Sequence, residues 1–193
     1  MWALKNLEWH REGQSDKMVR APHIAYLSAG SNLGDRKSNL EWALESLTAS
    51  GISLPSVSSF FETEPVDFQD QPWFLNIAIR AETDLSPVDL LQRCLDIERR
   101  RGRIRSFRGA PRSLDIDILL FDRDVLAQPG LIIPHPRMSK RRFVLGPLAE
   151  IAPEVVHPVL HKTIAELLRE CEDTSLVRPL PPGEDTREIL HRD

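Results

Sequence analysis

The stretch RGAPRSLDIDILLF, residues 108–121, decides the fold because it ends in a strand with two unlike faces. Apolar residues alternate along it and predict a strand from 114 to 121 with one face toward a core. The apolar positions are Leu114, Ile116, Ile118 and Leu120. On the other face, Asp115 and Asp117 point the same way with Cα atoms roughly 6.5 Å apart, so two like charges converge on one site.

The segments before this strand complete a β-α-β-β-α-β order. The expected elements are a strand at 24–29, a helix at 35–49, strands at 57–63 and 73–82, and a helix from Pro87 to about 101. The apolar sets are Leu40, Ala43, Leu44 and Leu47 in the first helix, Val88, Leu91 and Leu95 in the second, and Leu75, Ile77 and Ile79 on one strand face. Ser86 before Pro87 is a typical helix start. This order predicts an α+β, ferredoxin-like domain, an antiparallel sheet with packed helices.

Beyond this strand, the sequence predicts a C-terminal helical extension. Its helices are expected at about 146–151 and, behind Thr163 as a capping residue, at 164–170. The expected divisions are a flexible N-terminal extension at 1–22, one folded domain at 23–170 and a loosely attached tail at 171–193. Met18 is an alternative start of the chain, because the domain begins only a few residues after it.

The composition is that of an ordinary globular protein. With 41% hydrophobic and 28% charged residues, the 193 residues suit one domain. The longest apolar runs fall short of the roughly 20 residues that span a bilayer, and residues 1–22 lack the apolar core of a secretory signal. Cys94 and Cys171 have no metal-ligand spacing, so we expect a cytoplasmic protein with reduced thiols. The net charge of −4 argues against general nucleic-acid binding.

A dense run of arginines stands beside the two aspartates. It comprises Arg99, Arg100, Arg101, Arg103, Arg105, Arg108 and Arg112. Paired carboxylates suit Mg²⁺, which binds through one or two carboxylates plus substrate phosphates, and guanidinium groups bind phosphate in a bidentate manner. Taken alone, an Asp-x-Asp pair more often forms surface ion pairs of little energetic value. The neighbouring arginines favour a cradle for a polyphosphate instead.

Three other features bear on ligand binding. Residues 29–38, AGSNLGDRKS, run from a strand into a helix but lack the spacing of a Walker phosphate loop. Phe74 and Asn76 share a strand face, so they either stack on a flat heterocycle and bond its polar edge or simply pack within the fold. His135, held between two prolines, and Arg141 would complete the phosphate site.

Seven sequence blocks between residues 24 and 168 resemble the 6-hydroxymethyl-7,8-dihydropterin pyrophosphokinase family. In order they are GSNLGD, SSFFETEP, QDQPWFLN, GRIR, GAPRSLDIDILLF, IPHPRM and GPLAEIAPE, and APRSLDIDI alone is a specific signature. The resemblance implies an ATP-dependent pyrophosphokinase of folate biosynthesis, with 23–170 as its pyrophosphokinase domain. Its partners would be ATP and the pterin alcohol, without nucleic acid or membrane, and we expect a monomer, with a dimer left open.

For ATP, the resemblance implies a metal-assisted phosphate site. Asp115 and Asp117 would bind two Mg²⁺ ions that bridge the ATP phosphates. The implied ATP residues are Glu98, Arg103, Arg105, Arg112, Ile118, Leu131, His135 and Arg141, with Ile118 and Leu131 lining the adenine pocket. The implied catalytic residues are Arg103, Arg105, Arg112 and Asp117. The pterin oxygen would attack the β-phosphorus of ATP in line and release AMP.

For the pterin, the resemblance implies a ring enclosed by two aromatic side chains. The implied residues are Thr63, Glu64, Val66, Phe74, Asn76 and Phe143. Phe74 and Phe143 would stack on the ring, and Asn76 would bond its polar edge with Thr63. The segment 105–112 is one residue shorter than in some members, which leaves open whether Arg108 acts in loop closure. The alternative from another class is a ferredoxin-like module that binds nucleotide or RNA without catalysis.

Overall fold

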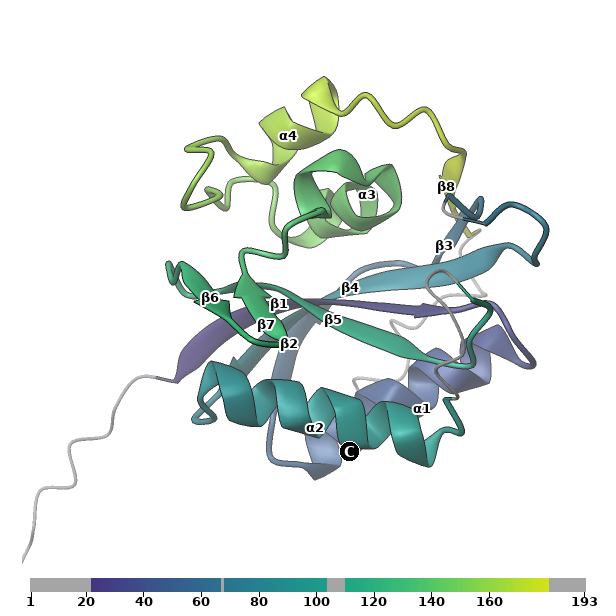
Figure 1. Cartoon of the computed structure of the whole chain (residues 1–193), viewed down its shortest axis with the longest axis horizontal. Helices are drawn as coiled ribbons and strands as arrows, with labels where there is room; N and C mark the ends of the chain where they lie inside the picture. The colour runs from purple at the N-terminus through teal and green to yellow at the C-terminus, as the bar shows by residue number, and fades with distance from the viewer. Residues whose placement is uncertain (1–21, 67, 104–109, 181–193) are drawn as a thin grey trace, which may run out of the picture.

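An antiparallel sheet forms the centre of the molecule, with helices on both of its faces (Figure 1). The computed structural model describes residues 22–66, 68–103 and 110–180. The sheet strands are β1 (His23–Ser31), β2 (Ser53–Val57), β3 (Phe61–Thr63), β4 (Phe74–Thr83), β5 (Asp115–Phe121) and β8 (Val177–Pro179). Their order is β5-β1-β4-β3-β8, with β2 also paired to β4. A separate hairpin joins β6 (Leu126–Gln128) to β7 (Leu131–Ile133).

The helices divide between the two faces of the sheet. They are α1 (Arg36–Ala49), α2 (Pro87–Arg100), α3 (Arg142–Ile151) and α4 (Ile164–Glu170), with a short 3₁₀ helix, η1 (Met138–Lys140). Figure 1 shows α1 and α2 beneath the sheet and α3 and α4 above it. The predicted α+β, ferredoxin-like order and the C-terminal helical extension are therefore confirmed. None of the described helices is long and apolar enough to cross a membrane.

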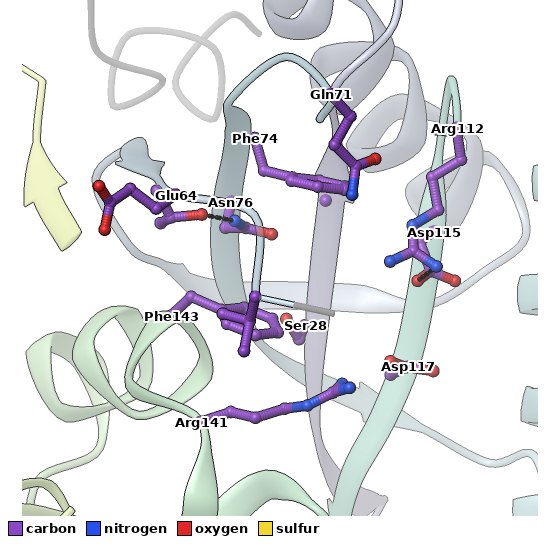
Figure 2. Close-up of a pocket in the computed structure, with 13 residues that line it drawn as sticks. Ser28, Glu64, Gln71, Phe74, Asn76, Arg112, Asp115, Asp117, Arg141 and Phe143 are labelled. Atoms are coloured by element: carbon purple, nitrogen blue, oxygen red, sulfur yellow. Dashed lines mark hydrogen bonds and ion pairs between the residues drawn. The ribbon is translucent and has the colours of Figure 1, made fainter. Parts of the chain in front are cut away.

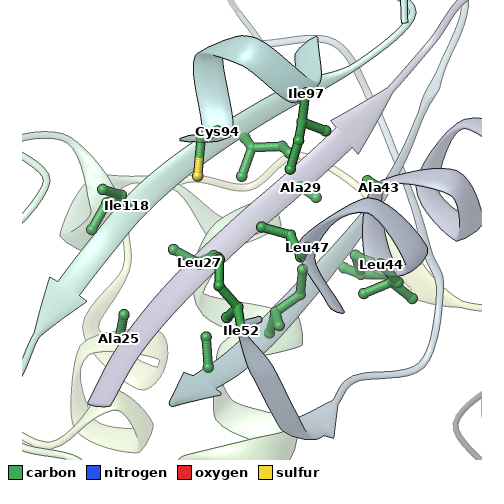
Figure 3. Packing of buried hydrophobic residues seen from close by; sticks show 14 of the residues in the cluster. Ala25, Leu27, Ala29, Ala43, Leu44, Leu47, Ile52, Cys94, Ile97 and Ile118 are labelled. Carbon is green, nitrogen blue, oxygen red and sulfur yellow. The ribbon is translucent and has the colours of Figure 1, made fainter. Parts of the chain in front are cut away.

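The main hydrophobic core lies between the sheet and the helices α1 and α2 (Figure 3). Leu27 and Ala29 of β1 are fully buried there, against Leu44 and Leu47 of α1. All four apolar residues predicted for α1 are buried, as is Cys94, whose thiol has its pKa raised to about 12 mainly by that burial. In α2 the buried stripe is Leu90, Cys94 and Ile97, whereas the predicted Val88 is exposed.

A β-bulge corrects one predicted strand face. Leu114, Ile116 and Ile118 enter the main core as predicted. Leu120 instead joins a second core with Tyr26, beneath α3 and α4. The reason is a shift in the β1–β5 register between Tyr26 and Leu27, because an extra residue in one strand turns all later side chains to the opposite face.

The predicted strand at 57–63 is two shorter strands. β2 ends at Val57 and β3 begins at Phe61. Between them the Ser58 hydroxyl accepts a hydrogen bond of 2.9 Å from the backbone N–H of Ala78 in β4. A side chain thus replaces a backbone partner at this point, which interrupts the ladder.

Two further differences concern the C-terminal region. Helix α3 begins at Arg142, four residues before the predicted start, although Pro147 lies inside it. Within the predicted tail, Val177–Pro179 form β8, which pairs with β3 at the sheet edge. Local sequence does not reveal either feature, because each depends on a partner far away in the chain.

Candidate active site

One pocket lies on the sheet face opposite α1 and α2, where α3 begins (Figure 2). It has a volume of about 550 Å³, which includes the open solvent at its mouth. Strands β1, β4 and β5 form its floor, and the first turn of α3 forms one wall. The predicted residues that line it are Thr63, Glu64, Val66, Phe74, Asn76, Arg112, Asp115, Asp117, Arg141 and Phe143.

The two aspartates of β5 point into this pocket from one strand face (Figure 2). Asp115 forms ion pairs with Arg103, at 2.5 Å between Nη1 and Oδ1, and with Arg112, at 2.9 Å between Nη1 and Oδ2. The pKa of Asp117 is raised to about 6, mainly by burial and also by the Asp115 carboxylate. Arg141 and Arg112 act in the opposite direction. Two carboxylates so placed repel each other, and a cation between them would relieve that repulsion.

Glu98 lies behind this acidic pair. It is 2% exposed, and its Oε1 accepts a hydrogen bond of 2.8 Å from the backbone N–H of Ile116. Its other oxygen forms an ion pair with Arg103. Burial raises the pKa of Glu98, and the Asp115 carboxylate raises it further. Glu98 therefore holds Arg103 beside Asp115, and it does not line the described pocket.

His135 and Arg141 approach from the side of α3. The backbone N–H of His135 donates to Leu119 at 2.9 Å, and its Nδ1 accepts from the backbone N–H of Arg137 at 3.2 Å. Burial lowers the pKa of His135 to about 4, and the positive charges of Arg141 and Arg137 contribute. The imidazole is therefore neutral at pH 7. The positive charge at this end of the pocket comes from Arg141, whose side chain extends toward Asp117 (Figure 2).

Two aromatic rings face each other across the other half of the pocket. Phe74 comes from β4 and Phe143 from α3 (Figure 2). The guanidinium of Arg112 lies 5.3 Å from the centre of the Phe74 ring, and that of Arg141 lies 5.2 Å from the Phe143 ring. Each aromatic ring is thus held beside an arginine, and the space between the rings suits a flat heterocycle.

The aromatic half of the pocket, here called the aromatic half-site, has a buried polar edge formed by Asn76 and Thr63. Asn76 is 4% exposed and Thr63 is 1% exposed. Asn76 Nδ2 donates to Thr63 Oγ1 at 2.7 Å, which fixes the orientation of the amide. A rigid amide in an apolar pocket selects a ligand with matching donors and acceptors, because an unmatched partner would leave buried polar atoms without hydrogen bonds.

The sequence analysis missed several residues of the pocket. Ser28, Gly30 and Gln71 also line it. A Cβ on Gly30 would lie 2.4 Å from Asn76 Oδ1, so the amide occupies the place of a side chain. Ser28 and Gly30 are two apart on β1, and Gly30 is opposite Asn76 in the register, so a predicted β1–β4 pairing would have found them.

Asn32 is a further residue that the sequence analysis missed. Its Nδ2 donates to Gln71 Oε1 at 2.9 Å and to the carbonyl of Pro72 at 3.1 Å. Its Oδ1 accepts from the backbone N–H of Arg112 at 2.8 Å. The segment 29–38, considered above as a phosphate loop, thus has a structural role beside the pocket.

Five predicted residues that the structure describes do not line the pocket: Glu98, Arg103, Ile118, Leu131 and His135. Ile118 and Leu131 are buried in the main core, at 4% and 6% exposure. Their role in an adenine pocket stays a prediction from the resemblance. Arg105 lies outside the described residues, as does Arg108.

The donor set of the pocket fits Mg²⁺ held together with a polyphosphate. The described residues contain no group of three or more His, Cys, Asp or Glu that would hold a metal alone. Asp115 and Asp117 nevertheless supply the two carboxylates that Mg²⁺ takes when phosphates complete its shell. Arg112 Nε is buried without a hydrogen-bond partner among the described residues, so an anion beside it would satisfy a donor.

Comparison with known proteins gives a consistent result. A family model described as 7,8-dihydro-6-hydroxymethylpterin-pyrophosphokinase matches residues 26–153. The 2-amino-4-hydroxy-6-hydroxymethyldihydropteridine pyrophosphokinase of Bacillus subtilis is 46% identical over 134 residues, which are 69% of this chain and 80% of the relative. The folic acid synthesis protein fol1 of Schizosaccharomyces pombe is 43% identical over 146 residues, 75% of this chain but 20% of that protein.

A crystal structure of Plasmodium falciparum HPPK-DHPS has a related fold. The TM-score is 0.63 at 18% identity, and the match covers 80% of this chain and 46% of that chain. The present chain therefore spans just under half the length of that protein. At this level of identity the likeness supports the fold alone.

Proposed function

Because the chain belongs to the 7,8-dihydro-6-hydroxymethylpterin-pyrophosphokinase family, we propose that it transfers pyrophosphate from ATP to the hydroxymethyl group of 6-hydroxymethyl-7,8-dihydropterin. The products are AMP and the pterin pyrophosphate. The name of the fol1 relative places this step in folate biosynthesis. The observation that carries the proposal is one pocket with paired aspartates and arginines at one end and facing aromatic rings at the other.

The aromatic half of the pocket is the proposed pterin site. Phe74 and Phe143 enclose the ring, and Asn76 bonds its polar edge with Thr63 behind it. The neighbouring pterin residues are Glu64 and Val66, which line the same wall. Stacking and a buried amide together select a flat ring with a hydrogen-bonding edge.

The charged half of the pocket is the proposed triphosphate site. Arg112 and Arg141 line it and Arg103 lies beside Asp115, so three guanidinium groups are within reach of one polyanion. The remaining proposed ATP residues are Glu98, Arg105, Ile118, Leu131 and His135. Two Mg²⁺ ions, held by Asp115 and Asp117, would neutralise charge on the phosphates.

In the chemical step, the pterin hydroxymethyl oxygen attacks the β-phosphorus of ATP in line. The bond from the β-phosphorus to the oxygen of the α-phosphate breaks, and AMP leaves with that oxygen. Arg103, Arg105 and Arg112 orient the transferred group and stabilise its charge. Asp117 is one of two candidate acceptors of the hydroxyl proton, and full activity in Asp117→Asn would rule this carboxylate out.

The fold gives no support to the nucleic-acid alternative. A module that reads RNA with sheet aromatics needs those rings on an open sheet face, but Phe74 is buried in the pocket and α3 and α4 cover part of the upper face. We therefore propose small-molecule substrates without nucleic acid or membrane. A monomer in the cytoplasm, with a dimer left open, completes the proposal. Its pyrophosphokinase domain is 23–170, to which β8 adds an edge strand from beyond that range.

The test is AMP release from Mg²⁺-ATP with and without 6-hydroxymethyl-7,8-dihydropterin. We expect pterin-dependent AMP in the wild-type protein and a rate at least about 100-fold lower in Asp115→Ala, because removing one electrostatic group at a transferring phosphate typically costs that much. Asp124→Ala, at an exposed aspartate near the end of β5, is the matched control and should keep the wild-type rate. Folded wild-type protein that binds ATP but releases no AMP would contradict the transfer.

A further inference from the structure

A C-terminal segment connects the two walls of the pterin half-site. We name residues 173–179 the strap; it runs from the end of α4 to β8 and contacts both β3 and the start of α3. None of its residues lines the pocket. In Figure 1 it crosses from α4 to the sheet edge beside α3.

At one end, the strap caps helix α3. Asp173 Oδ2 accepts a hydrogen bond of 2.8 Å from the backbone N–H of Arg142, and its Oδ1 accepts one of 2.9 Å from the backbone N–H of Ser175. The residue in the N-cap position, Arg141, makes no side-chain capping bond, and the first turn of α3 has no acidic residue. Asp173 therefore supplies both the acceptor and the negative charge that a helix N-terminus favours.

The ionisation of Asp173 agrees with this contact. Burial alone would raise the pKa of the Asp173 carboxyl. The hydrogen bonds from Ser175 and from the Arg142 backbone outweigh that effect, so the pKa lies below its usual value. The carboxyl is thus charged at pH 7, as a helix cap requires.

At its other end, the strap holds the β3 wall. The backbone N–H of Glu64 donates to the carbonyl of Leu176 at 3.1 Å, and the backbone N–H of Leu176 donates to Glu64 Oε2 at 2.8 Å. Val177 pairs with Thr63 in the sheet register. Both Thr63 and Glu64 line the pocket.

The strap also packs tightly against α3, the helix that forms the other wall. A Cβ on Gly146 of α3 would lie 3.3 Å from Val177 Cγ1, so helix and strap are packed without spare room. A shift of the strap would therefore move α3 relative to β3. The first turn of α3 supplies Phe143, which faces Phe74 across the space between the walls (Figure 2).

We propose that Asp173 is a positioning residue for the pterin half-site. It fixes the turn that carries Arg141 and Phe143 against the wall formed by Thr63 and Glu64, and so sets the gap into which the ring enters. This inference rests on the proposed function, since it takes the pterin as the ligand of that gap. Asp173 does not touch the substrate and acts through Phe143 and Arg141.

The test is the equilibrium Kd for 6-hydroxymethyl-7,8-dihydropterin in Asp173→Ala, followed by the fluorescence of the pterin. We expect a Kd roughly three- to tenfold above that of wild type. The loss of a helix cap shifts the equilibrium between the ordered and the loosened turn by about that factor, and only the ordered turn holds the ring. The Kd of Asp173→Asn should lie between those of wild type and Asp173→Ala, since an amide has one oxygen to accept from the two N–H groups. Glu172→Ala, at the exposed neighbouring residue, removes the same charge and should bind as wild type.

The measurements are made at a temperature where circular dichroism shows every variant folded. A cap that only stabilises the protein would lower the melting temperature and leave this Kd unchanged, which would overturn the inference. If Asp173→Ala does not fold, wild-type affinity in Asp173→Asn would overturn it equally. Wild-type protein that fails to bind the pterin would overturn the proposed function itself, whereas equal binding by wild type and variant would overturn only the role of Asp173.

Discussion

At the scale of single residues, the pterin half-site depends on one missing side chain. Asn76 Oδ1 occupies the position where a Cβ of Gly30 would be, at 2.4 Å. The contact is with the oxygen of an amide whose nitrogen donates a buried hydrogen bond to Thr63, so moving the amide away from a Cβ would disturb that bond. Gly30 is thus required here for space, not for its backbone angles.

Replacing Gly30 by alanine should therefore act on pterin binding. We expect Gly30→Ala to raise the Kd for the pterin about tenfold or more, because a displaced amide no longer meets the polar edge of the ring and leaves buried groups unpaired. ATP binding should change little. The measurement is isothermal titration calorimetry with each substrate separately.

A double-mutant cycle with Asn76→Ala provides the control. Once the amide is removed, the added methyl group has nothing to displace, so Gly30→Ala should reduce the affinity for the pterin much less in the Asn76→Ala background. Equal losses of pterin affinity in the wild-type and Asn76→Ala backgrounds would show that Gly30→Ala does not act through Asn76.

At the scale of secondary-structure elements, Glu62 joins three of them. From β3 it binds Arg36 of α1, at 2.9 Å between Nη2 and Oε1, and Arg178 of β8, at 2.5 Å between Nη2 and Oε2. Arg36 also donates to the carbonyl of Trp73 at 2.9 Å. The hydrogen bond from Arg178 lowers the pKa of Glu62, burial opposes that change, and Arg36 lowers it further.

This arrangement predicts a pH-dependent part of the stability. Because the pKa of Glu62 in the folded protein lies below its usual value near 4.5, the ion pairs stabilise the fold above that pH and are lost as the pH falls through the folded-state pKa. Glu62→Gln should lower the free energy of unfolding at pH 7 by roughly 0.5–1 kcal/mol, since Arg178 is largely exposed. It should also flatten the loss of stability below pH 4.5.

Urea unfolding at a series of pH values measures both effects. Glu45→Gln removes an equal charge from an exposed position on α1 and should leave the curve of stability against pH unchanged. If the stability of Glu62→Gln fell in parallel with that of wild type below pH 4.5, the lowered pKa assigned to Glu62 would be contradicted.

At the scale of the whole molecule, folding and ligand binding use different parts of the structure. The two hydrophobic cores lie on opposite faces of the sheet, and the pocket lies at one end of the upper face. Asp115, at the pocket, is paired with arginines in the ligand-free protein. Because these arginines already oppose the charge of Asp115, we expect the fold to form without Mg²⁺, unlike a zinc finger, which needs its zinc.

Removing Mg²⁺ should therefore separate stability from activity. We expect EDTA to abolish pterin-dependent AMP release and to leave the melting temperature of the ligand-free protein unchanged. Mg²⁺-ATP at about 100 times its Kd should add about 2.7 kcal/mol to the free energy of unfolding, and so raise the melting temperature by roughly 5–10 °C. EDTA should cancel that rise. Differential scanning fluorimetry measures these shifts, and a fall in the melting temperature of the ligand-free protein with EDTA would contradict the separation.

The sequence by itself determined the general alternation of strands and helices up to β5, apart from the division of one predicted strand into β2 and β3. It also determined the buried face of α1 and the convergence of Asp115 and Asp117 on one side of β5. These follow from local rules, because helical and strand periods repeat within a few residues. The resemblance to a family added residue roles, and the structure brings most of those residues to one pocket.

Only the tertiary structure decided how Asp173 caps α3, across 31 positions of sequence, and how Leu176 meets Glu64, across 112. It also decided that Gly30 makes room for Asn76, and that a bulge turns Leu120 away from the main core. Each of these depends on which segments lie side by side and in what register. The physical reason is that contact between distant residues is set by the packing of whole elements, which no local pattern of side chains encodes.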